Sequence, residues 1–395
     1  MITKIGDVCS FINGDRSKNY PSSTEFIESG IPFINAGHIE NQRISFDNMN
    51  YISEKKYNSL KSGKVKIGDV LFCLRGSLGK NAVIDFENDA AIASSLVIIR
   101  PNQSLIKSEY ISIYFNSLLF KNKLMKLNNG SSQPNLSAAS IKSIEISVPD
   151  MKKQNEIINK LLVTKELIDK QMEELELLNE LVRARFVEMF GDPVHSEKYG
   201  TRKLSSCVTE KSDMVDGPFG SQVNTKVDYI ENGEIPVIRT VNVKMMSFSP
   251  TDLKYMTREK YETVIRSQVL PGDVILTKVG TIGNVCIFPN TFDEAVLSTT
   301  GSCRIRVDNS VVNTQFFAYN LMYLKGKLLE IASAGVQPFL NMNHVKNIDI
   351  LDVPLEKQKE FADFVKEVDK SRSRIQKSLE ASQELFDSLM QEYFG

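Results

Sequence analysis

The stretch Gly68-Asp69-Val70-Leu71 returns 204 residues further along the chain as Gly272-Asp273-Val274-Ile275, and this repetition decides the fold. The same offset runs through nearly the whole chain, with a one-residue slip near Pro149 and Pro354. One offset shared by so many motifs indicates a tandem duplication, in which each copy fills about half of the 395 residues. The other repeated motifs are Ile31-Pro32-Phe33-Ile34 with Ile235-Pro236-Val237-Ile238, Gly76 and Gly79 with Gly280 and Gly283, Gln133-Pro134 with Gln337-Pro338, Lys153-Gln154 with Lys357-Gln358, and Phe190-Gly191 with Phe394-Gly395.

Each copy begins with a long segment that mixes short β-type runs with turns. The runs are rich in β-branched residues and are bordered by Gly or Pro, a pattern typical of strands. We therefore expect a mixed α/β (α+β) domain in each copy. The predicted strands include Val70–Leu74, Ser95–Ile99, Val274–Leu276 and Arg304–Val307.

Each copy ends in a long predicted helix, which opens after Pro149 in the first copy and after Pro354 in the second. Proline is favoured at or just before the first helical turn. Both segments then run for about 40 residues without Gly or Pro. At 1.5 Å per residue, each helix is expected to be roughly 60 Å long.

The two helices carry apolar residues at seven-residue spacing, which indicates a coiled coil. Arg372 interrupts this apolar seam in the second helix. The simplest partner for one helix is the other helix of the same chain; the alternative is two surface helices that each pack on their own domain. The seam residues are Leu161, Ile168, Leu175, Val182 and Met189 in the first helix, and Val365, Arg372, Leu379, Phe386 and Tyr393 in the second.

The predicted architecture is two similar mixed α/β domains joined by two long antiparallel helices that form an intramolecular coiled coil, with pseudo-two-fold symmetry. Two similar heads on a rigid spacer suit a bipartite target, because protein geometry then sets the distance between the two half-sites. The predicted boundaries are 1–149 for the first domain, 150–192 for the central helix, 193–353 for the second domain and 354–395 for the C-terminal helix.

The composition is that of a globular protein, with 42% hydrophobic and 25% charged residues. The chain has no apolar run of membrane-spanning length and no signal-peptide pattern at its start, so we expect a cytoplasmic protein without a membrane partner. Five cysteines at scattered positions argue against a disulfide framework or a zinc site, and we expect buried, inert thiols.

The charge balance is not typical of a nucleic-acid-binding protein. The net charge is −1, with 17 basic and 14 acidic residues over 1–150 and 17 of each over 193–353. Non-specific attraction to DNA is therefore expected to be weak for this chain alone, and a partner is expected to supply much of the phosphate contact.

No catalytic constellation is visible in the sequence. His38, His195 and His344 are scattered, and neither a zinc-protease H-E-x-x-H nor a dinucleotide-binding G-x-G-x-x-G is present. The glycines at 76 and 79 do not form a phosphate-binding P-loop, because Leu74 stands where that motif needs glycine and Asn81 where it needs Ser or Thr. The Asn-Pro-Pro-aromatic tetrad of amino-methyltransferases is also missing.

Three groups of residues carry a resemblance to a known family. They are the Gly68-Asp69-Val70-Leu71 motif with Gly76 and Gly79, together with its second copy; Val353-Pro354-Leu-Glu-Lys-Gln358, which opens a long helix; and Phe186-Val-Glu-Met-Phe-Gly-Asp192, which closes the central one. On these residues the whole chain resembles the specificity (S) subunit of type I restriction–modification systems. From this resemblance we expect the sequence to open almost directly on the family's first target-recognition domain, with little of the conserved segment before it.

The resemblance implies a sequence-specific DNA-binding subunit that is not itself catalytic. Each target-recognition domain would read one half of a bipartite, gapped site in double-stranded DNA. The helices would set the gap and dock two modification (methyltransferase) subunits, which restriction (motor-nuclease) subunits join. The resemblance implies no cofactor in this chain, whereas S-adenosylmethionine, ATP and Mg would bind the partner subunits.

Three alternatives stay open at this point. One is the recognition subunit of a related system whose partner fuses methylation and cleavage. Another is a coiled-coil adaptor whose domains bind proteins, and the third is an enzyme.

The glycine-bordered loop 76–80 and its copy 280–284 form the first candidate DNA-contacting segment. Closely spaced glycines allow the backbone to approach a ligand, although a hairpin turn between two core strands explains them equally well. The candidate residues here are Arg75, Ser77, Lys80, Lys278 and Thr281.

The polar stretches 128–135 and 333–341 form the second candidate segment. Gln and Asn side chains pair with adenine edges, and a capped turn with Ser137 and Asn341 as helix N-caps explains these stretches equally well. The candidates are Gln133, Asn135, Gln337 and Asn341.

The residues that follow each Ile-Pro strand form the third candidate segment, because they differ between the copies where two domains would read different sequences. Asn is suited to adenine and Arg to guanine, although ordinary surface loops differ in the same way. The candidates are Asn35, His38, Arg239 and Thr240, with Ser221 and Gln222 from the loop Gly217-Pro-Phe-Gly-Ser-Gln222.

Overall fold

The computed structural model describes residues 1–16, 18–127, 136–195, 198–332 and 338–395. These residues form two compact units. Unit 1 consists of Met1–Glu173 and Gln376–Gly395, and unit 2 of Glu174–Ile375. Unit 1 thus holds the first β-rich segment, the beginning of the first long helix and the end of the second. Unit 2 holds the second β-rich segment, the end of the first long helix and the beginning of the second.

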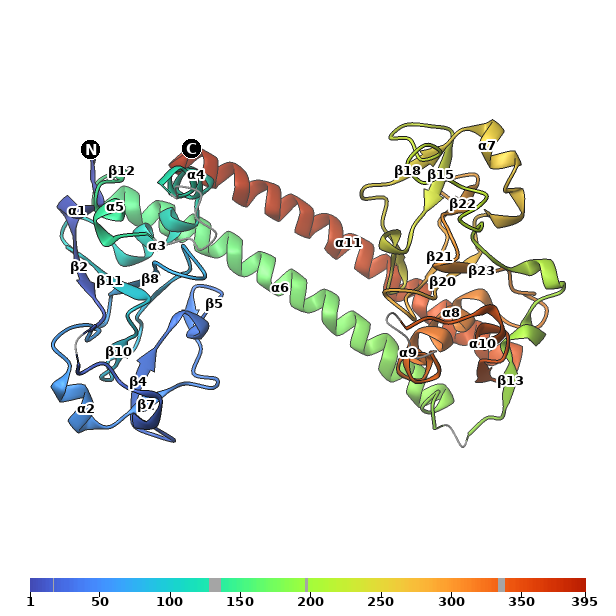
Figure 1. Cartoon of the computed structure of the whole chain (residues 1–395), viewed down its shortest axis with the longest axis horizontal. Helices are drawn as coiled ribbons and strands as arrows, with labels where there is room; N and C mark the ends of the chain where they lie inside the picture. Colours follow the sequence, from blue (N-terminus) through green and yellow to red (C-terminus); the bar gives the residue numbers. More distant parts are fainter. Residues whose placement is uncertain (17, 128–135, 196–197, 333–337) are drawn as a thin grey trace. The chain divides into compact units, whose positions relative to one another are not determined.

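Unit 1 is built on two four-stranded sheets. The first has the order β2-β11-β8-β9 and is antiparallel throughout, and helix α3 packs against β9. The second has the order β10-β4-β7-β3, in which β4 and β10 are parallel (Figure 1). The strands are β1 Ile2–Lys4, β2 Cys9–Asn13, β3 Phe26–Ile27, β4 Ile31–Ile34, β5 Ile39–Glu40, β6 Arg43–Ile44, β7 Tyr51–Ile52, β8 Val70–Cys73, β9 Asn81–Val83, β10 Ala91–Ile92, β11 Leu96–Pro101 and β12 Glu145–Ser147, and the short helices are α1 Ile5–Val8, α2 Glu54–Ser59, α3 Ser108–Asn116, α4 Leu118–Leu127 and α5 Ala138–Lys142.

Unit 2 repeats this plan except at the outer strand of its second sheet, where β19 pairs with β22 while β3 of unit 1 pairs with β7. This repetition confirms the predicted mixed α/β fold. The antiparallel sheet of unit 2 is β14-β23-β20-β21, and its second sheet is β18-β15-β22-β19 with β15 and β22 parallel. The strands are β13 Thr201–Lys203, β14 Met214–Asp216, β15 Ile235–Ile238, β16 Val243–Lys244, β17 Ser247–Phe248, β18 Lys254–Met256, β19 Gln268–Val269, β20 Val274–Thr277, β21 Val285–Ile287, β22 Ala295–Leu297, β23 Ser302–Ile305 and β24 Asp349–Leu351, and the short helices are α7 Arg258–Glu262, α8 Thr314–Tyr323, α9 Lys325–Ile331 and α10 Met342–Lys346.

The strand predicted at Arg304–Val307 lies two residues earlier, at Ser302–Ile305. The sequence-based prediction missed this start because Ser302 and Cys303 lack β-branched side chains. Pairing with β20 extends the strand, since Thr277 lies opposite Ser302 in the register.

The repeated Gly-Asp-Val-Leu motif is explained by a buried carboxylate. Asp69 is almost fully buried, and its Oδ2 accepts a hydrogen bond from the Lys66 amide at 2.7 Å. Arg100 grips the same carboxylate with two bonds, Nε to Oδ1 at 2.6 Å and Nη2 to Oδ2 at 2.7 Å. A buried carboxylate needs such partners, and a two-pronged arginine is the strongest of them. The equivalent clamp of unit 2 joins Asp273 to the Leu270 amide and to Arg306.

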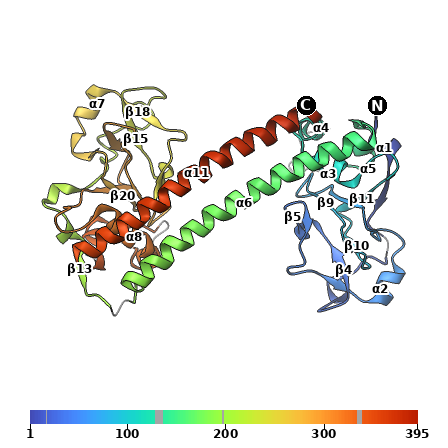
Figure 2. The same ribbon diagram turned by 180° about the vertical axis from the view of Figure 1, so that it is seen from behind.

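The predicted antiparallel helix pairing is confirmed within each unit. Helices α6 (Met151–Phe190) and α11 (Leu355–Phe394) are each 40 residues long. In unit 1 the beginning of α6 lies beside the end of α11, as both views show, and Lys160 Nζ donates to Tyr393 Oη at 3.3 Å (Figure 2). In unit 2 the end of α6 lies beside the beginning of α11, where Arg185 Nη2 pairs with Glu360 Oε1 at 3.1 Å.

Both long helices contribute to the core of each unit, so they are not surface helices of single domains. In unit 1, the ring of Phe394 packs on those of Tyr110 and Tyr114 at centroid distances of 5.2 and 5.8 Å. In unit 2, Phe186 from α6 packs edge-on against Phe361 from α11 at 5.3 Å. Apolar burial therefore holds the helix pair and the sheets together.

The predicted seam residues are buried or half-buried, and Leu161, Val182 and Val365 belong to these cores. The interrupting Arg372 is accommodated by hydrogen bonds, because its Nη2 donates to Asn179 Oδ1 at 3.1 Å and it pairs with Asp369. The fully buried predicted residues are Leu161, Ile168, Val182 and Val365, and the half-buried ones are Leu175, Leu379 and Phe386.

All five cysteines are buried free thiols, as predicted. Burial raises the pKa of Cys9, Cys286 and Cys303 to about 12, which keeps these thiols protonated and unreactive. Among the described residues, no helix combines the length and the apolar character that crossing a membrane requires.

Candidate nucleic-acid interface

The β8–β9 hairpin holds the first predicted segment. The Cys73 amide donates to the Lys80 carbonyl at 2.8 Å and closes the turn. Gly76 and Gly79 have φ of +74° and +86°, a left-handed backbone that glycine adopts most readily. The hairpin interpretation is therefore confirmed, and it leaves the side chains of the loop exposed. These are Arg75, Ser77 and Lys80 in unit 1, with Thr281 at the equivalent hairpin of unit 2.

Described residues in or next to the second predicted segment, Leu136 in unit 1 and Leu340 in unit 2, contact the base of the same hairpin. In unit 1, the Leu136 amide donates to the Leu74 carbonyl at 3.1 Å. In unit 2, the Leu340 amide donates to the Lys278 carbonyl at 2.9 Å. Residues far apart in the sequence thus meet just beyond the end of one strand, β8 in unit 1 and β20 in unit 2.

The predicted N-caps of this segment are confirmed. Ser137 Oγ accepts from the backbone amide three residues on in α5, and Asn341 Oδ1 does the same in α10, at 3.1 and 2.8 Å. Asn341 is exposed at its surface. Gln133, Asn135 and Gln337 lie outside the described residues.

The end of each Ile-Pro strand meets the same region through one short loop. The Ala93 amide donates to the Ile34 carbonyl at 2.7 Å, and the Ser298 amide to the Ile238 carbonyl at 2.9 Å. The loop then reaches the hairpin. Its contacts there are Leu74 N–H to Ser95 O at 3.0 Å in unit 1, and Lys278 N–H to Gly301 O at 2.7 Å in unit 2.

Asn35 and Arg239 occupy equivalent positions beyond these strands and differ in their local partners. Asn35 Oδ1 accepts from the Gly37 amide at 2.7 Å. Arg239 Nη2 pairs with Asp252 Oδ2 at 2.8 Å. Hydrogen bonds from Arg239 and then Lys254 lower the pKa of Asp252, so this carboxylate stays ionised and offsets the arginine charge.

The loop that begins at Gly217 lies directly on the Ser298–Gly301 loop. A Cβ at Gly217 would come within 2.0 Å of the Thr299 carbonyl oxygen, so only glycine allows this approach. Ser221 and Gln222 follow in this loop and are exposed, and Gln222 Oε1 accepts from the Phe219 amide at 3.0 Å.

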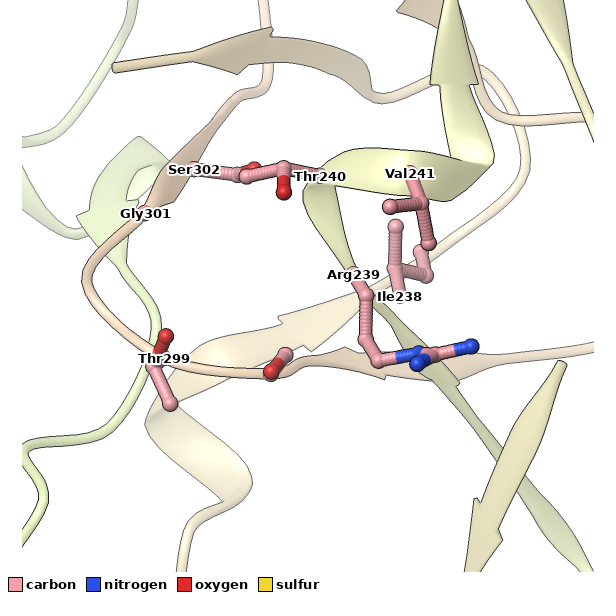
Figure 3. Close-up of a pocket in the computed structure, with 8 residues that line it drawn as sticks. Ile238, Arg239, Thr240, Val241, Thr299, Gly301 and Ser302 are labelled. Carbon is pink, nitrogen blue, oxygen red and sulfur yellow. The ribbon is translucent and has the colours of Figure 1, made fainter. Parts of the chain in front are cut away.

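In unit 2 the end of the Ile-Pro strand, the residues directly after it and the segment 298–302 line a pocket of about 260 Å³ (Figure 3). Its wall is rich in hydroxyl groups, and the side chains of Thr240 and Ser302 extend toward one another, while that of Arg239 extends away from them. The lining residues are Ile238, Arg239, Thr240, Val241, Ser298, Thr299, Gly301 and Ser302.

The structure gives His38 a structural role in place of the predicted DNA contact. Its side chain is buried, its Nδ1 accepts from the Asn35 amide at 3.1 Å, and its Nε2 lies 3.3 Å from the Asn48 carbonyl. Asn242, the equivalent residue in unit 2, accepts from the Arg239 amide in the same way at 3.0 Å. Both side chains fold the turn and do not face outward.

Lys278 also departs from its predicted role. Its side chain is 3% exposed, and its Nζ lies 2.8 Å from Asp216 Oδ2. A buried ammonium group needs such a partner, and a phosphate outside the unit does not reach it. Lys278 therefore supports the base of the hairpin.

Sequence reasoning missed Ser302 and Thr299, which line the pocket. Neither residue stands in a recognisable motif. A comparison of the two copies could have identified Ser302. Leu96 pairs with Cys73 in unit 1, and Ser302 pairs with the equivalent residue, Thr277, in unit 2, so an apolar residue of one copy is replaced by a hydroxyl in the other.

The family model described as "Type I restriction modification DNA specificity domain" matches residues 1–179 and 216–383. The chain belongs to this family. The two matched ranges correspond to the two copies found in the sequence, and membership assigns the chain to DNA specificity and not to catalysis.

Specificity subunits from archaea and bacteria are similar over almost the whole chain. The MjaIX specificity subunit of Methanocaldococcus jannaschii is 22% identical, covering 98% of this chain and 91% of its own. The StySPI subunit of Salmonella potsdam is 21% identical, covering 98% of this chain and 86% of its own. The solved S subunit from M. genitalium shares the fold with a TM-score of 0.61 at 14% identity, covering 100% of this chain and 96% of its own.

Proposed function

We propose that this specificity-family chain reads a bipartite, gapped sequence in double-stranded DNA, with one half read by each unit. The observation that supports this most is that three segments meet in both units. They are the hairpin, the loop next to the end of the Ile-Pro strand, and the capped segment that begins at Leu136 in unit 1 and at Leu340 in unit 2. Exposed loops held on a rigid scaffold are the usual place for base and phosphate contacts. Because the loops differ between the units, the two half-sites differ in sequence.

Modification subunits dock, in this proposal, on the exposed side of α6. That helix carries exposed apolar side chains in i, i+4 pairs: Val163 and Leu167 in unit 1 are 65% and 46% exposed, and Leu177 and Leu181 in unit 2 are 55% and 47% exposed. Exposed apolar residues that recur on one face mark a protein contact. The equivalent residues of α11 are more polar and comprise Glu367, Ser371, Ala381 and Leu385.

Two modification subunits would bind, one at each unit, and restriction subunits would complete the assembly. S-adenosylmethionine would then be bound by the modification subunits, and ATP with Mg by the motor-nuclease subunits. This chain would supply the DNA sequence preference and the spacing between the two half-sites.

The decisive experiment is co-expression of the chain with the modification subunit of its own system, followed by mapping of methylated bases in the host DNA. We expect a gapped motif methylated in each half, and no such methylation without this chain. A soluble, assembled complex that directs no methylation would refute DNA specificity and favour a protein-binding adaptor.

Docking is tested separately with Leu167→Glu, which places a charge on the exposed apolar face of α6. We expect at least a tenfold loss of affinity for the modification subunit and an unchanged thermal midpoint, because Leu167 lies outside the cores. Ser371→Glu changes the equivalent residue of α11 and serves as the matched control. Equal affinity for both variants would contradict docking on α6.

A further inference from the structure

We infer that the hydroxyl-lined pocket of unit 2 receives a base edge, with Ser302 as its specificity-determining residue. This inference rests on the proposed function, in which unit 2 reads one half of a gapped DNA site. It goes further by naming one residue, one half-site and the uncharged chemistry of the contact.

The first reason for this inference is the buried hydroxyl group of Ser302. Its side chain is 3% exposed, and its Oγ has no hydrogen-bond partner among the described residues. A buried hydroxyl without a partner is unfavourable, and a ligand group that supplies the partner removes this penalty. Thr240 faces Ser302 in the pocket, and Thr299 lies in the same wall (Figure 3).

The charge of the pocket distinguishes a base from a phosphate. Arg239 is the one cationic residue among the residues that line the pocket, and it is held by Asp252 at 2.8 Å. Its side chain also extends away from Ser302 (Figure 3). Charged donors make the strongest contacts with a phosphate, whereas neutral serine and threonine hydroxyls donate to or accept from any base edge. The wall therefore suits an uncharged base edge.

The comparison with unit 1 confines this chemistry to one half of the target. Leu96 pairs with Cys73 in the strand register, as Ser302 pairs with Thr277, and Leu96 is fully buried without a polar group to offer. The loop before it also differs, since residues 93–95 of unit 1 correspond to 298–301 of unit 2. Unit 1 must therefore read its half-site with other groups.

The test is Ser302→Ala in the full chain, co-expressed with the modification subunit, with methylated bases mapped in host DNA. Alanine removes only an unpaired hydroxyl, so the fold is kept. We expect discrimination at one base position of the second half-site to fall by about tenfold, which is the size of one hydrogen bond. The first half-site should stay unchanged. Ser206→Ala, an exposed serine of unit 2 away from the pocket, is the matched control.

Gly301→Val provides a second variant that fills the pocket. A Cβ at Gly301 already lies 3.2 Å from Thr240 Cγ2, so a valine takes the space that a base edge would use. We expect methylation of all sites to fall while gel filtration shows an intact complex.

Two results would overturn the inference. One is an unchanged motif and extent of methylation in both variants. The other is a Ser302→Ala complex that binds every sequence equally weakly with a reduced salt dependence, which indicates a phosphate contact. A wild-type complex that directs no methylation would refute the proposed function itself.

Discussion

Removing the buried carboxylate of one repeat should destabilise one unit and leave the stability of the other unchanged. The Asp69→Ala variant loses two charged bonds to Arg100 and one bond to the Lys66 amide. All three bonds end on the Asp69 carboxylate, and hydrogen bonds to a charged group contribute about 1.5–3 kcal/mol each, or at least about 4.5 kcal/mol together. We expect less than this sum because the Arg100 side chain is 29% exposed and water solvates it after the mutation. The expected destabilisation of unit 1 is therefore about 3–4 kcal/mol.

Hydrogen exchange followed by mass spectrometry is the suitable assay, because the chain contains no tryptophan to report unfolding. A loss of about 3 kcal/mol accelerates the slowest amides of β8 and β11 by roughly a hundredfold, while amides of β20 and β23 keep their rates. Asp273→Ala should show the reverse pattern. The control is Glu156→Gln, which breaks an exposed pair with Lys153 and should change exchange by less than about fivefold. The reasoning fails if Asp69→Ala accelerates exchange less than fivefold, or equally in both units.

Two further predictions concern the surface and the thiols. Lys80→Ala removes an exposed cation of the unit 1 hairpin; we expect the slope of log affinity against log salt for DNA to fall by about 0.9 with the methylation motif unchanged, measured by titrations at several salt concentrations. The high pKa of the Cys9, Cys286 and Cys303 thiols, about 12, means that these groups stay neutral from pH 7 to 9; a thiol reagent should label them slowly at either pH in the native chain and rapidly in urea, and fast native labelling that rises with pH would contradict this.

Much of the fold could be predicted because the duplication repeats its core positions. The long helices follow from an unbroken period and from Pro149 and Pro354 at their starts. The second sheet of each unit could not be predicted, because strands such as β3 and β10 are two residues long and show no alternation. The parallel pair β4–β10 joins segments far apart in the chain, which no local pattern reveals.

The candidate site could be predicted in position but less well in its residues. Residue type suggested that His38 reads DNA. In the structure the His38 side chain accepts a hydrogen bond from the backbone amide three residues before it, and Asn242 does the same in the other copy. Residue type likewise suggested a DNA contact for Lys278. In the structure Lys278 pairs with Asp216, and the equivalent residues of unit 1 are Leu74 and Asn13. A comparison of both positions in the two copies would have indicated that Lys278 and Asp216 form an ion pair that unit 1 lacks.

The offset between the two copies shows how such a chain changes its target without changing its scaffold. Paired strands cannot absorb a single insertion, because a one-residue slip turns every side chain to the other face of the sheet. Loops absorb it, and here the offset changes only between strands and returns to its original value at the capped segment. The offset is 204 from Cys73 to Thr277, 203 from Asn13 to Asp216, 205 from Ile92 to Leu297, 206 from Leu96 to Ser302 and 204 again from Leu136 to Leu340. One of these changes falls in the loop that lines the unit 2 pocket, so the same core can present a different reading surface at each half-site.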